Sequence, residues 1–182
     1  MFTTRPELSG TFGMVASTHW LASAAGMAVL ERGGNAFDAA VAAGFALQVV
    51  EPHMNGLGGD MPLLFRHDGQ VRVLCGQGPA PAGATLAAYA GLDLVPGTGY
   101  LAACVPGAFD AWLLLLRDFG TFELADVIAY AIGYARDGFP LTPGIARAIR
   151  ALEPSWTSSA ELWRERPRLR NLLLADTYAR LA

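Results

Sequence analysis

The sequence contains no lysine: all 13 of its basic residues are arginine. A chain without lysine cannot form a Schiff base through its own side chains, cannot anchor pyridoxal phosphate, and lacks the lysine of nucleotide-binding phosphate loops. Charge of either sign is also scarce, at 16% of 182 residues, against roughly 25% in an average soluble domain. The 53% of hydrophobic residues excludes a disordered chain and is an apolar surplus that a free domain of this length should not show.

Cysteine and histidine are few and scattered. The chain has two cysteines, Cys75 and Cys104, which form no disulfide framework and have no second cysteine at metal-binding spacing. His19, His53 and His67 lack His, Cys or Glu partners at ligand spacing. We therefore expect neither a metal nor a cofactor.

Long apolar runs and an excess of positive charge are lacking as well. The longest apolar stretches, 36–50 and 108–116, are too short to span a bilayer, and the N-terminus has no apolar run of secretory type. The net charge of −3 argues against nucleic acid, because duplex binding depends on contacts to phosphate. Glu161 and Glu165 dilute the basic cluster at 164–170, which we interpret as a solvated or interface-lining face. We expect a soluble, cytoplasmic protein that binds neither nucleic acid nor a membrane.

Hydrophobic periodicity and turn residues predict a helix-rich chain with few strands. Asn35, with Asp38 three positions on, should cap a helix over 36–50 that is apolar nearly all round and therefore buried on several sides. Asp68-Gly69 lies in the expected turn of a hairpin of strands 61–66 and 71–75. The other expected elements are a strand over 13–17 and helices over 20–32, 86–90, 105–119, 123–136, 143–151, 159–166 and 168–181. This α+β or layered α/β pattern is typical of half of a layered core.

The most distinctive local feature is a glycine-rich loop over 51–60. It precedes a strand rather than a helix, and no Gly-Lys-Ser/Thr follows, which argues against a phosphate loop. The loop is either a tight turn where backbone approaches backbone or the lining of a substrate cleft with exposed amides. Its candidate cleft residues are His53, Asn55, Gly56, Gly58 and Gly59. The residues alone reveal no complete catalytic constellation.

In their order, the motifs resemble the N-terminal region of the large subunit of the γ-glutamyltransferase (glutathione hydrolase) family. The resemblance extends from Gly13 to about Ile149, and the combination is far more specific than any single motif. The matching segments are Gly13-Met14-Val15-Ala16-Ser17-Thr18-His19, Leu21-Ala22-Ser23-Ala24-Ala25-Gly26, Gly33-Gly34-Asn35-Ala36-Phe37-Asp38-Ala39-Ala40-Val41-Ala42-Ala43, Val50-Glu51-Pro52-His53, Gly56-Leu57-Gly58-Gly59, Val105-Pro106-Gly107 and Asp137-Gly138-Phe139-Pro140.

The resemblance implies an N-terminal-nucleophile amidohydrolase with a four-layer αββα sandwich, of which residues 1–182 would be a single, incomplete domain. In that family a precursor cleaves itself before a threonine, whose hydroxyl attacks the substrate amide and whose α-amine serves as base. That threonine begins the small subunit, beyond this sequence, so we expect no catalytic residue here and no activity from this chain alone. The implied partners are a small-molecule amide substrate and the small subunit of the same precursor, in a homo- or heterotetramer of bacterial origin. The alternative is a non-catalytic remnant or binding partner.

One departure from the family pattern concerns substrate recognition. Typical members carry Asp-Gly-Arg-Glu-x-Ala-Pro, whose arginine holds the α-carboxylate of the γ-glutamyl group. Here the stretch reads Cys75-Gly76-Gln77-Gly78-Pro79-Ala80-Pro81, with Gln77 at the position of the arginine. A neutral amide can donate to one carboxylate oxygen but cannot form the charged bidentate pair. Gln77 therefore favours an acyl group other than γ-glutamyl, with oxamate-type amides as the nearest candidate. The alternative is that the Gln77 side chain only forms hydrogen bonds with backbone amides of its own loop.

Overall fold

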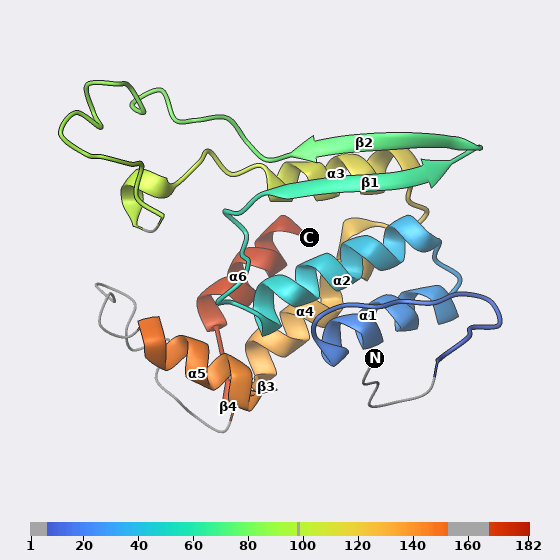
Figure 1. The fold of residues 1–182 in the computed structure, drawn as a ribbon. Coiled ribbons are helices and arrows are strands. Elements are labelled where there is room, and N and C mark those ends of the chain that lie inside the picture. The colour runs from blue at the N-terminus through green and yellow to red at the C-terminus, as the bar shows by residue number, and fades with distance from the viewer. Residues whose placement is uncertain (1–6, 98, 153–167) are drawn as a thin grey trace.

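The computed structural model describes residues 7–97, 99–152 and 168–182. Within these ranges the chain is a helical body with two short antiparallel sheets (Figure 1). Helix α1 (Trp20–Glu31) packs along α2 (Ala36–Val50), and α4 (Leu124–Asp137) also packs on α2. These contacts make α2 the central helix, in agreement with its nearly continuous apolar sequence.

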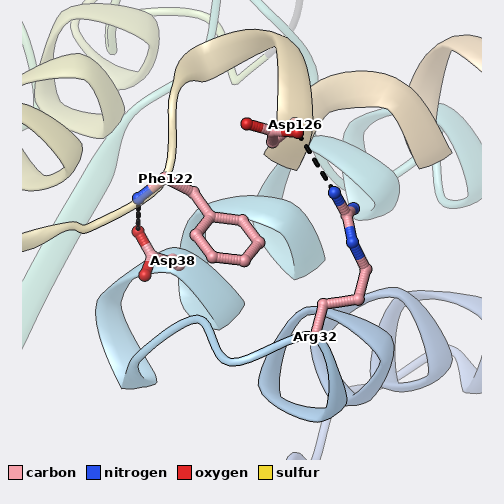
Figure 2. Close-up of polar contacts among 4 residues, drawn as sticks. All are labelled: Arg32, Asp38, Phe122 and Asp126. Carbon is pink, nitrogen blue, oxygen red and sulfur yellow. Dashed lines mark hydrogen bonds and ion pairs between the residues drawn. The ribbon is translucent and has the colours of Figure 1, made fainter.

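The start of α2 is fixed by the residues that the sequence singles out. The Asn35 side chain accepts hydrogen bonds from the amides of Phe37 and Asp38, and the Asp38 carboxylate accepts one from the Asn35 amide at 2.7 Å. This reciprocal capping box satisfies amides that the first turn of a helix leaves without partners. Asp38 also reaches the amide of Phe122, close to the ion pair between Arg32 and Asp126 (Figure 2).

The predicted hairpin is confirmed and slightly longer than expected. Strands β1 (Met61–His67) and β2 (Gln70–Gly76) pair antiparallel, and the turn residues Asp68 and Gly69 have φ of 49° and 76°. Two successive positive φ angles are typical of the type I′ turn, whose twist matches that of the strands. The hairpin lies over α3 (Ala108–Phe119), with β2 in contact with it (Figure 1). Its other face leaves Leu64, Val71 and Val73 exposed.

Two further helices and a second, very short sheet complete the described body. Helix α5 (Pro143–Leu152) follows β3 (Phe139–Pro140), which pairs with β4 (Arg168–Leu169) just before α6 (Leu172–Leu181). The long connection from β2 to α3 projects from the body and contains the short 3-10 helix η1 (Tyr100–Ala102) (Figure 1). Its apolar side chains Leu86, Leu94 and Tyr100 are exposed.

Three expected elements differ from the structure. The strand expected over 13–17 is not paired: its backbone makes no hydrogen bond to any residue that the structure describes. The helix expected over 86–90 is a series of turns. The helix expected over 168–181 begins at Leu172, because Arg168 and Leu169 pair with β3 and Asn171 caps the helix.

The other boundaries are close to those expected. Helix α3 begins after its N-cap residue Gly107 rather than at Val105, and the backbone of residues 105–107 lies against the end of β2. The helix expected over 159–166 lies outside the described residues.

A buried polar contact connects α6 to the central helix. The Tyr178 hydroxyl donates to Gln48 Oε1 at 2.6 Å, and both side chains are buried among Phe45 and its neighbours. Burial raises the pKa of Tyr178 above its ordinary value, so the hydroxyl stays protonated and remains a donor.

Replacing Tyr178 with Phe should lower the free energy of unfolding by about 1–3 kcal/mol, because Gln48 Oε1 would be left buried without its donor. Urea denaturation of the variant measures this loss. Tyr134→Phe is the matched control, because the Tyr134 hydroxyl is less buried and reaches the Leu21 carbonyl only at 3.4 Å. An equal loss in both variants would contradict the role given to the Tyr178 bond.

Candidate functional site

The glycine-rich loop joins α2 to β1 and is attached to the start of α3. The carbonyl oxygen of Gly59 accepts hydrogen bonds from the amides of Gly107 at 3.2 Å and Ala108 at 3.1 Å. Within the loop, the Gly59 amide donates to the Gly56 carbonyl at 3.0 Å. The loop therefore contains a close backbone turn, one of the two interpretations of its sequence, and the N-terminus of α3 holds it in place.

Gln77 directly follows β2 and is exposed. The Cys75 thiol donates to Gln77 Oε1 at 3.5 Å, a long contact through a weak donor. The glycines on either side have no room for a side chain. A Cβ on Gly76 would lie 2.8 Å from the Met61 carbonyl oxygen, and one on Gly78 would collide with the carbonyl oxygen of Val105. Gln77 is thus the one residue of the 76–78 segment that can present a side chain.

Residues 105–108 bring the two predicted segments to one end of the hairpin. The Val105 amide donates to the Pro79 carbonyl at 3.0 Å, while Gly107 and Ala108 bind the glycine-rich loop. A Cβ on Gly107 would lie 2.5 Å from the Gly76 carbonyl oxygen, so these backbones touch without side chains between them. The Gln77 segment and the glycine-rich loop therefore lie at the same end of the hairpin, and these backbone contacts fix the position of each.

A cavity of about 470 Å³ lies beside this loop, between α2, the start of β1 and the start of α3. Asn55 and Gly56 of the candidate residues line it, whereas His53, Gly58, Gly59 and Gln77 are not among its lining residues. Polar groups at the cavity come from Thr18, Gln48, Glu51, Asn55 and Asp60. Their hydroxyl, amide and carboxylate groups can donate or accept hydrogen bonds to a molecule in the cavity.

Two of these polar groups are joined to each other. Thr18 Oγ1 donates to Glu51 Oε2 at 2.5 Å, which ties the turn before α1 to the C-terminal end of α2. Asn55 Nδ2 donates to the Glu51 carbonyl at 3.2 Å, so the loop is held to the same helix end.

Two histidines lie near the candidate site, His53 in the loop and His19 at the start of α1. His53 is half-buried, and its Nδ1 has no hydrogen-bond partner. His19 is buried, and its Nδ1 accepts from the Leu21 amide at 3.2 Å, which caps α1. Burial lowers the pKa of His19, against the opposing charge of Glu51. His19 Nδ1 therefore caps α1, and the lowered pKa favours the neutral form of the ring.

Among the described residues, no group of three or more His, Cys, Asp or Glu side chains could hold a metal ion. The described helices include none that is both long and apolar enough to cross a membrane.

Sequence reasoning missed four residues of the cavity wall. Thr18 and Glu51 lie 33 positions apart, so no local sequence pattern indicates the hydrogen bond between them. Gln48 is a polar residue within an otherwise apolar turn of α2, and this signal could have marked it as a cavity residue. Trp112 lies over Gly44 of α2, where a Cβ would collide with its ring.

The described residues form a helix-rich α+β structure with polar side chains around a cavity at one end of its hairpin. The gamma-glutamyltranspeptidase family matches residues 22–182. The chain belongs to this family.

Curated relatives support the assignment over most of the chain. The glutathione hydrolase-like YwrD proenzyme of Bacillus subtilis is 46% identical over 136 residues, covering 73% of this chain and 26% of that protein. The oxamate amidohydrolase proenzyme of Klebsiella pneumoniae is 38% identical, covering 94% of this chain and 36% of that protein. The chain thus spans about a third or less of the length of these relatives.

Solved structures of related proteins match the fold. The structure of LmbA2991HD superposes with a TM-score of 0.89 at 60% identity, covering all (100%) of this chain and 34% of that one. The gamma-glutamyltranspeptidase of Helicobacter pylori gives a TM-score of 0.89 at 32% identity, covering 97% of this chain and 55% of that one. The chain is therefore a fragment that matches part of the gamma-glutamyltranspeptidase structures.

Proposed function

We propose that this chain is the N-terminal part of the large subunit of an amidohydrolase that acts on a small acyl group other than γ-glutamyl, with oxamate-type amides as the nearest candidate. The observation that carries this proposal is Gln77, displayed between two glycines at the end of β2, where family members carry the arginine that holds the γ-glutamyl carboxylate. An oxamate amidohydrolase proenzyme is among the relatives, at 38% identity over 94% of this chain, beside glutathione hydrolase proenzymes of similar identity, so the family includes enzymes of both substrate classes.

The reacting groups of the proposed mechanism are not among residues 1–182. A downstream threonine, freed as an N-terminus when the precursor cleaves itself, would attack the substrate amide carbon while its α-amine takes the hydroxyl proton. The tetrahedral intermediate would expel the protonated amine and leave an acyl-enzyme, which water or an acceptor amine then resolves. Gln77 and the loop at 55–56 would bind the acyl group during these steps.

The uncovered face of the hairpin supports a larger assembly. Leu64, Val71 and Val73 are exposed on one face while the other packs on α3. A four-layer αββα sandwich would cover this face with a second sheet, since stacked sheets bury their apolar faces against each other. The covering sheet would come from the small subunit of the same precursor, in a bacterial, cytoplasmic homo- or heterotetramer.

The first test is whether the full-length protein cleaves itself and which amides it hydrolyses. We expect mass spectrometry to find two subunits, and we expect oxamate to be hydrolysed more efficiently than a γ-glutamyl anilide. A full-length protein that is never cleaved and hydrolyses neither substrate would instead support the alternative of a non-catalytic remnant. Efficient γ-glutamyl transfer by the native protein would refute the inference from Gln77.

Replacing Gln77 with Arg should raise kcat/KM for the γ-glutamyl anilide relative to oxamate by about tenfold or more, since a charged bidentate pair is stronger than one neutral hydrogen bond. The gain should be specific to the γ-glutamyl α-carboxylate, which is separated from the reacting amide carbon by three carbons, whereas the carboxylate of oxamate is bonded to that carbon directly. Steady-state kinetics of the processed enzyme on both substrates measure the ratio. Gln70→Arg is the matched control, because Gln70 pairs with His67 beside the turn, at the opposite end of the hairpin. The same change in ratio from Gln70→Arg would show that added charge, not position, causes the effect.

A further inference from the structure

Two exposed side chains, those of Cys75 and Gln77, meet at the end of β2. Successive residues of a strand point to opposite faces, so residues two positions apart share a face. A Cβ on Gly76, between the two, would collide with the Ala111 side chain of α3. Cys75 and Gln77 therefore lie on the opposite face of the hairpin, which points away from α3.

The Cys75 thiol is the one hydrogen-bond partner that the Gln77 side chain has among the described residues. The thiol donates to Gln77 Oε1 at 3.5 Å. No backbone amide of the described residues donates to this oxygen, and the NH₂ group of Gln77 donates to no described residue. The donor end of the Gln77 amide is therefore available to a bound molecule.

The backbone on both sides of Gln77 is fixed by close contacts. Gly76 is buried against α3, and Gly78 lies against the carbonyl group of Val105. The glutamine side chain, in contrast, has several rotatable bonds, and ordering them costs entropy when a ligand binds. A partner that orders the side chain before binding lowers this cost. Cys75 is placed to be that partner.

The two ends of a glutamine amide recognise opposite chemical groups. The oxygen only accepts hydrogen bonds, whereas the NH₂ group only donates them. With Oε1 held by the thiol, Gln77 presents its NH₂ group, which can bind a carboxylate or carbonyl oxygen. The reverse orientation would present Oε1, which repels a carboxylate and suits an ammonium group. The orientation of this amide therefore decides which class of acyl group is bound.

We propose that Cys75 is a positioning residue for Gln77: its thiol holds Oε1, so that the Gln77 NH₂ group faces the carboxylate of an oxamate-type acyl group. Cys75 forms no covalent bond in this role and touches no reacting atom. The pair selects an acyl group with an anionic acceptor over one with an ammonium group at the same place. The inference rests on the proposed function, because it takes Gln77 to bind the acyl group.

Substitutions at Cys75 in the full-length, processed protein test the role of the thiol. Cys75→Ala should raise KM for oxamate about three- to tenfold, as expected for the loss of one neutral hydrogen bond, and should leave kcat nearly unchanged. Cys75→Ser returns a donor to the same place and should recover most of the loss. Cys104→Ala is the matched control, because Cys104 is also an exposed free cysteine but does not bond to Gln77.

A double-mutant cycle separates positioning from a general effect on the structure. If the thiol acts through Gln77, Cys75→Ala should cause no further rise in KM when Gln77 has already been replaced by Ala. The same rise in both backgrounds would show that Cys75 acts by another route and would overturn the proposal. No rise from Cys75→Ala in the native background would overturn it as well.

Oxalate provides a measurement that needs no turnover, because it carries the same carboxylate and no amide to hydrolyse. In calorimetric titrations we expect Kd for oxalate to rise about three- to tenfold in Cys75→Ala and to recover in Cys75→Ser. Failure of the proposed function would appear as a native protein that hydrolyses no oxamate, and the oxalate titration would still decide the role of Cys75. A native protein that binds no oxalate, or that binds it equally well after Cys75→Ala, would overturn the inference.

Discussion

Replacing Asp38 with Ala should destabilise the protein by about 3–5 kcal/mol, the usual cost of removing one partner from a buried, charge-assisted network. Asp38 is fully buried, with 0% of its surface exposed. Its Oδ1 accepts from the amides of Thr121 at 2.8 Å and Phe122 at 3.1 Å, and its Oδ2 from the Asn35 amide and the Thr121 hydroxyl, both at 2.7 Å. Four donors would lose their acceptor at once.

Asp38→Asn is the sharper variant, because it keeps the shape and removes the charge. Both carboxylate oxygens face donors, so whichever way the amide is turned, its NH₂ group must point at an N–H or a hydroxyl. We therefore expect a loss of stability approaching that of Asp38→Ala in a urea titration. A loss within the error of the measurement would show that the network does not hold the start of α2 to residues 121–122.

The same carboxylate predicts a dependence on pH. Burial opposes the ionisation of Asp38, but the hydrogen bonds from Thr121, Asn35 and Phe122 outweigh it and hold its pKa below the ordinary value. A lowered folded-state pKa gives stability that is present above the unfolded value of about 3.9 and is lost as pH falls through the folded value. The difference in unfolding free energy between the native protein and Asp38→Asn should narrow below about pH 4.

Asp126→Asn is the control for both experiments. Asp126 lies near Asp38 and forms an ion pair with Arg32 at 3.1 Å, but both side chains of that pair are nearly half exposed (Figure 2). Exposed ion pairs contribute little, because solvent screens them. Asp126→Asn should leave the denaturation midpoint within experimental error, and a loss as large as that of Asp38→Asn would contradict the distinction between the two carboxylates.

The cap of α2 shows how far local sequence can go. Asn35 and Asp38 predicted the start of the helix, because a capping box depends only on residues three positions apart. The further donors to Asp38 come from Thr121 and Phe122, 83 and 84 positions away. No periodicity or motif in the chain marks that pairing, so the cap was predictable and its role as a tertiary anchor was not.

The candidate site, too, could be predicted only in part from local sequence. The hairpin was predictable from Asp68-Gly69, and the hairpin in turn positions Gln77. The contact that fixes Gln77, between residues 76–79 and 105–107, joins segments separated by a long loop and consists of backbone alone. The unpaired state of residues 13–17 was also beyond local reasoning, because a strand forms only when a partner supplies the other half of its hydrogen bonds.

Replacing Gly78 with Ala should destabilise the Gln77 segment by about 2–5 kcal/mol, through two costs that can be separated. Gly78 has a φ of 73°, which costs a residue with a Cβ about 1–2 kcal/mol. The new Cβ would also collide with the Val105 carbonyl oxygen, and overpacking of this kind costs about 1–3 kcal/mol more. Because the obstacle is backbone rather than a flexible side chain, residues 78 and 105 must move apart.

Gly91→Ala isolates the first cost from the second. Gly91 has a similar φ of 87°, but no atom lies within 4 Å of the Cβ it would gain. Urea denaturation should therefore show a smaller loss for Gly91→Ala than for Gly78→Ala, and only Gly78→Ala should speed hydrogen exchange of the Val105 amide, which donates to the Pro79 carbonyl. If both variants lose the same stability and the Val105 amide stays protected, the backbone contact does not hold Gln77 in place. The position of the Gln77 side chain would then not favour one acyl group, and other residues of the site would determine which acyl group binds.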